Sequence, residues 1–453
     1  MTRVVIVGAG PSGLALANKY CKLPDTSVVV IDKNNTIGGC HRVTRENGLF
    51  SEHGPRVYSS AYLQVEQLLS DMNLKFEHVF KKTKSTLATY IGKVFKNLKI
   101  LEILSLACSF IVLIFNTEYG KTIPLDVYIR KFTPESKDFI NRLCTILDGS
   151  DSSKFSLNRF LQAINIQGLY SFYELSQSSD TGLFRYWKHY LLSHNVDFRL
   201  GRQVTRLEFN KEYTRILSVI LDNNVHVYGD IFILAVPPIN IHSIYNSLNM
   251  NYILDNMYND SVCMTFHWTN PIKLQNDNNT LNKSDWGIIC SELEFTTGHS
   301  PSFAGTMISV MVSRMYHKSL FINKTVKECS KKEIIAEVFR QLITQVYNHP
   351  IVKYDNVVFP DSTDTAFVES PNSQFLDFSF PGINNLYNVG THNGNSHFPF
   401  TSMESAVSNA NALFELLHPE CEPSIKRVQQ TVVATTRYFF CILLVFAIVY
   451  NYV

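Results

Sequence analysis

The sequence predicts an α/β fold that opens with a Rossmann-type unit. Three observations predict it: an apolar run over residues 4–7, the glycine turn Gly8-Ala9-Gly10-Pro11-Ser12-Gly13 directly after it, and a second apolar run over residues 27–31 that ends at Asp32. A strand, a glycine turn, a helix and a second strand ending in an acid form the pattern of dinucleotide-binding βαβ units.

Each position of the turn has a physical role in such a unit. Gly8 permits the tight turn, Gly10 lets a pyrophosphate approach the backbone, and Gly13 lets the helix pack closely on the strand. The helix that starts after the turn offers free N–H groups and partial positive charge to phosphate. Asp32 is suited to accept hydrogen bonds from the adenosine ribose. A chance glycine turn in another βα unit would not explain Asp32.

A second glycine element follows. Asp32-Lys33 and the pair Gly38-Gly39, with Arg42 and then Gly54-Pro55-Arg56, resemble the second FAD-binding motif of the amine oxidase, protoporphyrinogen oxidase and phytoene desaturase superfamily, most of all its protoporphyrinogen oxidase branch. The resemblance implies FAD as the cofactor, with Arg42 at the pyrophosphate and the Gly54-Pro55-Arg56 turn near the isoalloxazine. The alternative for Arg42 and Arg56 is that both are solvated surface arginines.

Later segments resemble further elements of this superfamily. The resemblance implies that the backbone of Val204 meets adenine and that Gly390 and Thr391 end a late strand at the ribityl chain, although many members carry an acid where Thr391 stands. Thr401 to Val407, with Met403 among them, then open a helix that runs through Leu417, and Thr401 and Glu404 have capping-box spacing. Its N-terminus would stabilise negative charge on reduced flavin.

The interleaving of these segments predicts a discontinuous FAD-binding domain, an inserted α+β substrate domain and a C-terminal apolar helix. The expected divisions are 1–85, 195–245 and 356–425 for the FAD-binding domain, 86–194 (mostly helical) and 246–355 for the substrate domain, and 431–453 for a transmembrane tail anchor.

Composition excludes several classes. A net charge of +2 gives no reason to propose nucleic acid as a partner. Nine cysteines are scattered without a CxxC pair or metal-ligand spacing, which predicts no metal site and favours a reducing compartment. The chain enters a predicted core strand at once, so we expect no signal peptide.

Two apolar stretches are candidates for contact with a membrane. Residues 103–115 are too few for a span, so they predict a buried helix, with a membrane-dipping surface as the alternative. Residues 438–453 approach spanning length once the preceding threonines are included. We therefore expect a single-pass tail anchor with the catalytic body cytosolic. The alternative is a terminal helix docked on the body or in a dimer interface.

The catalytic residues cannot be assigned from the sequence. A loose alignment puts Met264 where amine oxidases carry a lysine, and no cysteine matches a covalent-flavin motif. His267, His392 and His397 are candidate polar groups, although a lone histidine is more often structural.

The sequence as a whole predicts an FAD-dependent oxidoreductase in which a small, lipophilic substrate gives a hydride to flavin. O2 and another oxidant both stay open as the electron acceptor. Two alternatives remain: a flavin-dependent non-redox enzyme similar to UDP-galactopyranose mutase, and a non-catalytic membrane-attached flavoprotein.

Overall fold

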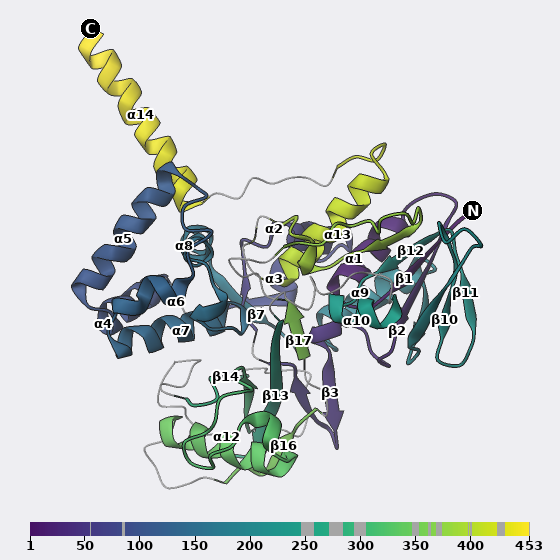
Figure 1. Ribbon diagram of the computed structural model, residues 1–453, viewed down its shortest axis with the longest axis horizontal. Coiled ribbons are helices and arrows are strands. Elements are labelled where there is room, and N and C mark those ends of the chain that lie inside the picture. Colours follow the sequence, from purple (N-terminus) through teal and green to yellow (C-terminus); the bar gives the residue numbers. More distant parts are fainter. Residues whose placement is uncertain are drawn as a thin grey trace.

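The computed structural model describes residues 1–453 except 55, 84–86, 246–257, 271–283, 294–304, 347–352, 361–363, 368–373, 397, 399–400, 424–430 and 453. Its elements fall into three groups: an α/β part, a helical part, and an antiparallel sheet backed by one helix (Figure 1).

A five-stranded parallel sheet forms the centre of the α/β part. Its strands lie in the order β18 (Leu386–Asn388), β12 (Ile231–Leu234), β1 (Thr2–Val7), β2 (Thr26–Asp32) and β8 (Asp197–Leu200). Every neighbouring pair is parallel. The predicted Rossmann-like α/β sheet is therefore confirmed, and it takes its strands from widely separated stretches of the chain.

Alternation along β1 explains how both faces of this sheet are covered. Val4 and Ile6 pack with helices α1 (Pro11–Tyr20) and α13 (Met403–Leu417). Val5 and Val7 point the other way. They pack with a small antiparallel sheet of β9 (Val204–Phe209), β10 (Ile216–Leu221) and β11 (His226–Tyr228). Residues 4–7 of the strand are all apolar because both faces are buried there.

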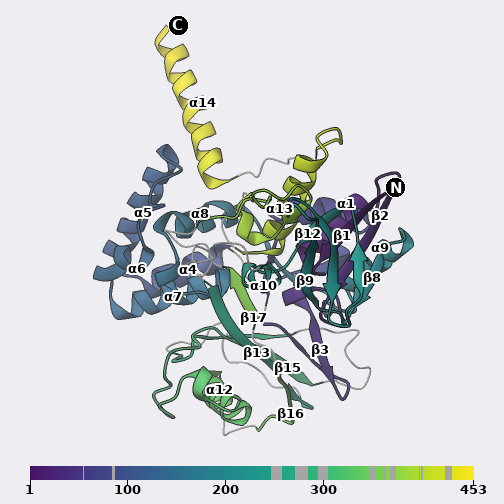
Figure 2. The same ribbon diagram turned by 45° about the vertical axis from the view of Figure 1, so that its right-hand side comes forward.

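A second sheet is antiparallel and lies below the first in Figures 1 and 2. Its order is β14 (Ile288–Glu292), β15 (Thr306–Val312), β13 (Tyr258–Trp268) and β16 (Asn356–Val358), and β17 (Asp364–Phe367) also pairs with β13. Helix α12 (Lys331–Val346) covers one face. The other face is left for the α/β part.

The helical part lies on the left in Figure 1. It contains α4 (Leu87–Asn97), α5 (Ile100–Phe115), α6 (Leu125–Tyr128), α7 (Pro134–Asp148) and α8 (Leu157–Gln167). An ion pair between Arg159 and Asp148, with 2.5 Å between nitrogen and oxygen and both side chains almost fully buried, joins α8 to α7.

The remaining elements connect these parts. They are β3 (Val43–Glu46), β4 (Leu49–Glu52), β5 (Tyr58–Ser59), α2 (Leu63–Asp71), α3 (Phe76–Val79), β6 (Phe80–Lys82), β7 (Phe172–Leu175), α9 (Leu183–Ser193) and α10 (Pro238–Ile244), with 3-10 turns at Gly39–His41, Ile129–Lys131, Ser152–Lys154, Val326–Glu328 and Thr391–Asn393.

Helix α14 (Val432–Tyr452) ends the chain and rises from the helical part (Figure 1). Its first turn is docked: Val433 is buried, its N–H donates to Asn165 Oδ1 at 2.8 Å, and the Arg437 guanidinium donates to the Ile114 carbonyl. Within the described part of the chain, no helix combines the length and the apolar character needed to cross a membrane. The tail anchor stays a prediction.

Candidate dinucleotide-binding site

The two glycine turns predicted from the sequence meet at the carboxyl end of the parallel sheet. The Gly38 N–H donates to the Ala9 carbonyl at 2.8 Å. Gly10 and Gly39 lie back to back: a Cβ on Gly39 would fall 2.9 Å from the Gly10 Cα. A Cβ on Gly10 would meet nothing nearer than 3.7 Å. The space beside Gly10 is therefore open backbone surface of the kind that a pyrophosphate approaches.

The other glycines of the first turn are required by the fold itself. Gly8 has φ +112°, and a Cβ there would lie 2.3 Å from the Ala235 carbonyl oxygen. A Cβ on Gly13 would lie 2.0 Å from the Gly8 carbonyl oxygen. Pro11 is the first residue of α1, where its missing N–H costs nothing, and Ser12 follows it, buried. The N-terminus of α1 is thus held against the turn.

Asp32 closes the turn at the end of β2. One carboxylate oxygen accepts a hydrogen bond from the Ala9 N–H at 2.8 Å. The other accepts from the Asn34 N–H and side-chain amide at 2.8 and 2.9 Å. The carboxylate therefore stabilises the turn, and its remaining lone pairs are the acceptors that a ribose would use. Lys33 is exposed.

Two arginines bind the second glycine element. The Arg42 Nη1 donates to the Gly39 carbonyl at 2.9 Å. The Arg56 Nη2 donates to the Cys40 and His53 carbonyls, the latter at 3.1 Å, so it ties the 3-10 turn Gly39–His41 to the turn at Gly54. Neither arginine is a purely solvated surface residue. Pro55 lies outside the described residues.

Gly54 faces the antiparallel sheet. Its φ is +90°, and a Cβ there would lie 3.3 Å from both the Cys263 Sγ and the Met311 Sδ. The adjacent carboxyl of Glu52 is buried, which raises its pKa to about 7, and its Oε1 accepts from the Ser179 N–H at 3.2 Å. Burial also places the pKa of His41 well below its usual range. Two buried titratable side chains, Glu52 and His41, therefore lie beneath the second glycine element, and burial disfavours the charged form of both.

The late elements reach the same edge of the sheet. Gly390 follows β18, and the Val389 N–H donates to the Leu234 carbonyl at 3.1 Å. Thr391 is partly exposed and begins a 3-10 turn. Met403, buried, is the first residue of α13. Val204 is buried at the start of β9 in the core behind the parallel sheet.

The predicted capping box of α13 is wrong in its residues. Ser402, not Thr401, is the N-cap, and its Oγ accepts from the Ser405 N–H at 3.1 Å. The Glu404 carboxylate instead accepts from the Gln64 and Val65 N–H groups at 2.9 to 3.1 Å. It therefore caps α2 on a neighbouring segment. The spacing of residues within one helix cannot show that a carboxylate of that helix caps a different one.

The register of β13 shows which of its side chains face the turn at Gly54. Met264 is fully buried on the face that packs on α12, as are Val262 and Phe266. Cys263 points to the opposite face, toward Gly54. Cys263 pairs with Met311, and Met311 with Ile289, so these three side chains form one row across the sheet. Because neighbouring residues of a strand face opposite ways, Cys263 and not Met264 faces Gly54.

The candidate histidines have structural partners. His267 Nε2 lies 2.9 Å from the Phe50 carbonyl, and His392 Nε2 lies 3.1 Å from Asn388 Oδ1. Burial lowers the pKa of both, that of His392 to about 3, so both are neutral at physiological pH. His397 lies outside the described residues.

A small pocket opens between α7 and β14. Ile289, the last residue of the row across the sheet, is part of its wall, together with Arg142 and Arg314. The Arg142 Nε is 3.1 Å from Asp138 Oδ2, and the buried Arg314 Nε has no hydrogen-bond partner among the described residues. The full lining is Asp138, Arg142, Thr145, Ser284, Gly287, Ile288, Ile289 and Arg314. The pocket therefore combines an apolar wall with two guanidinium groups.

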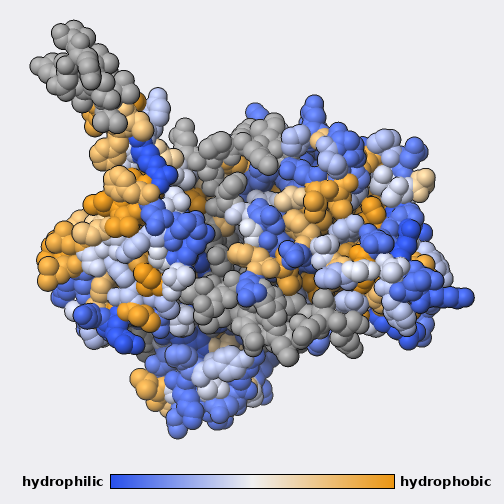
Figure 3. Space-filling view, turned by 45° about the horizontal axis from the view of Figure 1, so that its top comes forward, coloured by the Kyte–Doolittle hydropathy of each residue, from blue (hydrophilic) through white to orange (hydrophobic). Residues whose placement is uncertain are grey.

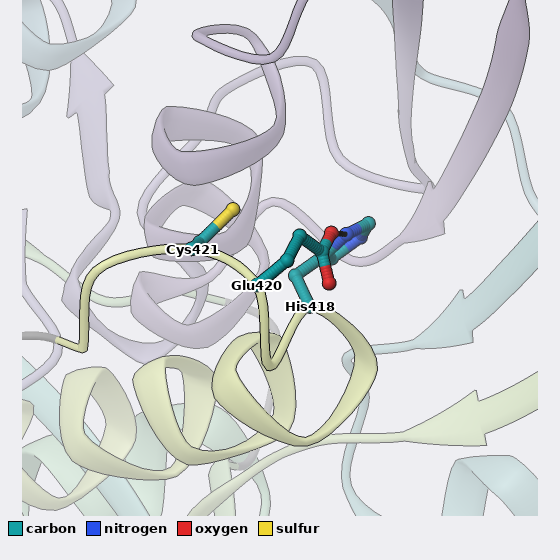
Figure 4. Close-up of side chains that lie close together, drawn as sticks. All are labelled: His418, Glu420 and Cys421. Atoms are coloured by element: carbon teal, nitrogen blue, oxygen red, sulfur yellow. Dashed lines mark hydrogen bonds and ion pairs between the residues drawn. The ribbon is translucent and has the colours of Figure 1, made fainter.

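One group of potential metal ligands comes together among the described residues, in the loop after α13 (Figure 4). The ligand atoms of His418, Glu420 and Cys421 lie within 4.8 Å of one another. His418 Nδ1 is already paired with Glu420 Oε1 at 2.9 Å, and the Glu420 side chain is 67% exposed. These three residues follow α13, and none of them belongs to the glycine turns of the candidate site.

Comparison with known proteins supports this description of the fold. A family model described as an NAD(P)-binding Rossmann-like domain matches residues 6–72. Protoporphyrinogen oxidase 2, chloroplastic/mitochondrial, of Arabidopsis thaliana is 37% identical over 78 residues, which are 17% of this chain and only 15% of that protein. The sequence similarity is thus confined to a short part of both chains.

Solved structures extend the likeness to nearly the whole chain. A protein from Exiguobacterium sp. 255-15 that carries a provisional protoporphyrinogen oxidase name has a TM-score of 0.64 and 15% identity, over 93% of this chain and 99% of that one. Putrescine oxidase bound to putrescine has a TM-score of 0.61 and 16% identity, over 92% and 99%. The chain therefore has the fold that these oxidases share, and the resemblance expected from the sequence is confirmed at the level of the fold.

Proposed function

We propose that the protein is an FAD-dependent oxidoreductase that accepts a hydride from a small, lipophilic substrate. The observation that carries the proposal is the meeting of two glycine turns, with Gly10 and Gly39 back to back and open space where a Gly10 side chain would stand. Such a surface suits a dinucleotide pyrophosphate. In this proposal segments 1–85, 195–245 and 356–425 form the FAD-binding domain, and segments 86–194 and 246–355 form the substrate domain.

The residues around this surface fit FAD. Gly8 to Gly13 and the α1 N-terminus would hold the pyrophosphate, Asp32 the ribose, and Arg42 a phosphate oxygen once its guanidinium turns from the Gly39 carbonyl. The turn at Gly54, fixed by Arg56, would lie at the isoalloxazine, and Gly390 and Thr391 at the ribityl chain. The N-terminus of α13 at Met403 would stabilise negative charge.

The substrate side is apolar. Flavin supplies the redox chemistry by accepting the hydride. The chain's own contribution is the row Cys263, Met311 and Ile289, which would exclude water and hold an apolar substrate in front of the turn at Gly54. Strand β13 contains no lysine, which argues against the lysine-dependent amine oxidation of many relatives. The row therefore favours a lipophilic substrate over a polar amine.

Absorbance of the purified protein tests the cofactor. We expect a flavin spectrum, and release of intact FAD by heat or acid, because no covalent-flavin motif is present. Flavin that stays with the precipitated chain would disprove non-covalent binding. Lipophilic reductants should then bleach the bound flavin anaerobically, and readmission of O2 should show whether O2 is the electron acceptor.

The pocket with Arg142 and Arg314 favours a second candidate function. Two guanidinium groups would suit the diphosphate of a sugar nucleotide once the small pocket widened and Arg142 turned from Asp138. A flavin-dependent non-redox enzyme similar to UDP-galactopyranose mutase would need such a site. A rise in the melting temperature with a sugar nucleotide, abolished by Arg314→Ala, would favour this candidate over the oxidoreductase. Flavin that neither substrate nor dithionite reduces would favour the non-catalytic alternative.

We also propose that the tail attaches the protein to a membrane. The support is the position of α14, whose first turn is docked and whose following residues Tyr438, Phe439, Phe440 and Leu443 are exposed and apolar. A membrane location would bring the protein close to lipophilic substrates.

A further inference from the structure

Helix α5 is apolar on two sides, and only one of them is buried. Leu113 and Ile114 pack into the helical core, while the other apolar side is exposed. Leu101 and Phe115 are 75% and 76% exposed. Every exposed residue of the helix is apolar or a cysteine: Ile100, Leu101, Leu104, Ala107, Cys108, Ile111, Val112 and Phe115. We call this set the α5 face. The prediction that the helix at residues 103–115 is buried is therefore wrong for the residues of the α5 face.

The opposite side of α5 carries the polar residues and packs inward. Ser105 Oγ and Ser109 Oγ lie 2.8 and 2.9 Å from the Tyr128 hydroxyl. The Glu102 carboxylate, buried, accepts from the Thr133 N–H at 2.6 Å and from Ser136 Oγ at 2.5 Å. These bonds fix the rotation of the helix about its axis. The α5 face cannot turn inward without breaking them, so its exposure is built into the fold.

The base of α14 extends the same surface. Arg437 of α14 donates to the Ile114 carbonyl of α5, which joins the base of α14 to the C-terminal end of α5. Beyond this contact the exposed residues of α14 include Tyr438, Phe439, Phe440 and Leu443. Figure 3 shows apolar residues gathered on the side of the body from which α14 rises. Two neighbouring helices thus present one apolar surface, larger than scattered surface residues provide.

The exposed charges near the start of α5 are basic in excess. Lys96 and Lys99 are exposed there, and Arg130 and Lys131 are exposed after α6, whereas the exposed acids of this region are Asp126 and Glu135. The acid nearest the end of α5, Glu118, is paired with Lys121 at 2.5 Å. A basic rim beside an apolar helix face with aromatic residues is the composition of helices that lie in a bilayer interface.

We propose that the α5 face and the exposed base of α14 form a lipid-binding surface that lies on an anionic bilayer. The α5 face would enter the boundary between headgroups and acyl chains, with Lys96 and Lys99 at the anionic headgroups. A second copy of the chain is the competing occupant. The exposed lysines favour lipid, because they complement the charge of anionic headgroups. The proposal does not depend on flavin binding.

Tryptophan quenching by brominated lipid tests the proposal directly. The chain's three tryptophans, Trp187, Trp268 and Trp286, are at most 2% exposed, so an added one reports its own surroundings. We would compare Leu104→Trp on the α5 face with Leu320→Trp, which replaces a leucine that is 90% exposed on the antiparallel-sheet part. The probe is full-length protein with vesicles of three parts phosphatidylcholine to one part phosphatidylserine.

Quenching of the added tryptophan in Leu104→Trp, but not in Leu320→Trp, by brominated acyl chains would support the proposal. If the Leu104→Trp variant emits equally with and without bromine on the acyl chains, the proposal is wrong. This holds even if α14 keeps the protein on the vesicle. A dimer in light scattering that Leu104→Glu dissociates, together with unquenched emission of the Leu104→Trp variant, would assign the face to a second copy instead.

A charge substitution supplies the second measurement. Leu101→Glu with Leu104→Glu should weaken vesicle binding at least about tenfold, because burial of one leucine contributes more than the free energy of a tenfold change in affinity. The matched control, Leu320→Glu with Leu416→Glu, changes two exposed leucines elsewhere and should bind as the parent does. Equal binding by both double variants, together with unquenched emission of the Leu104→Trp variant, would rule the surface out.

Discussion

The carboxylate of Asp32 accepts a hydrogen bond from the backbone N–H of Ala9 at 2.8 Å, across the glycine turn. Its second oxygen accepts from the Asn34 N–H at the same distance. The acid expected to hold the ribose therefore also fixes the shape of the turn before any ligand arrives. Pre-formed geometry of this kind lowers the cost of binding.

Asp32→Ala should consequently destabilise the protein even without flavin. It removes the acceptor of two backbone N–H groups, and hydrogen bonds to a charged group contribute about 1.5–3 kcal/mol each. We expect the free energy of unfolding of the flavin-free protein to fall by at least about 3 kcal/mol, and FAD affinity to fall as well. Chemical denaturation and flavin titration measure the two effects. Asp197→Ala, at an exposed carboxyl, is the control, and equal stability of both variants would contradict the role of Asp32.

Gly10→Val should abolish FAD binding while the protein still folds. Gly10 has φ −80°, which valine adopts, and a Cβ there would have no neighbour nearer than 3.7 Å. The side chain would occupy the proposed pyrophosphate space, and the poorer N-cap would cost about 1 kcal/mol. The measurement is the ratio of flavin to protein absorbance, with a melting curve. Gly92→Val on α4 is the control, because a Cβ there meets no atom within 4 Å. A yellow Gly10→Val protein would place the pyrophosphate elsewhere.

Arg56→Ala should weaken FAD binding by at least about tenfold, the change that corresponds to one lost charge-assisted hydrogen bond. The guanidinium ties the Cys40 carbonyl to the His53 carbonyl, so its loss releases both turns that would enclose the flavin. Arg56→Lys should restore part of the affinity, and Arg206→Ala, at an exposed position, should change nothing. Flavin that binds Arg56→Ala as tightly as the parent but is reduced more slowly would instead place Arg56 at the flavin face alone.

The sequence predicted what local patterns determine. The two glycine turns, Asp32 and the apolar strand at residues 4–7 follow from spacing, and the structure has them. The predictions from the sequence failed where contacts between distant parts of the chain determine the structure. Glu404 caps α2 rather than its own helix, and Met264 packs toward α12 while its neighbour Cys263 faces Gly54. Helix α5 has the periodicity of a core helix, and only its tertiary bonds through Glu102 show which face is outward.

The burial of Glu52 makes stability depend on pH. Its pKa is about 7 in the folded protein, above the ordinary glutamate value, so the folded state holds the proton more tightly. The stability that this proton provides is fully present below about pH 4.5 and is lost as pH rises through about 7. The full effect is on the order of 3 kcal/mol. Glu52→Gln should flatten the curve of unfolding free energy between these values, while the exposed Glu46→Gln should not. If the curves of Glu52→Gln and of the parent protein ran parallel, Glu52 would be charged over this whole pH range and its pKa would not be raised.

The point at which the tail is cut should decide whether the protein stays folded. Val433 is 3% exposed in a cluster with Leu113, Leu157 and Leu161, and its N–H donates to Asn165, so the first turn of α14 belongs to the helical core. A chain ending at Arg437 keeps these contacts and should melt close to the full-length protein. A chain ending at residue 430 should lose about 2 kcal/mol for the valine alone.

The same two truncations test the anchor. If residues beyond Arg437 hold the protein in a membrane, full-length protein should resist an alkaline wash, and the chain ending at Arg437 should be stripped by it, still folded and yellow. Retention of the shorter chain after that wash would make the α5 face the stronger attachment. Equal melting of the two truncated chains would mean that the first turn of α14 contributes nothing to the core, against the burial of Val433 and its bond to Asn165.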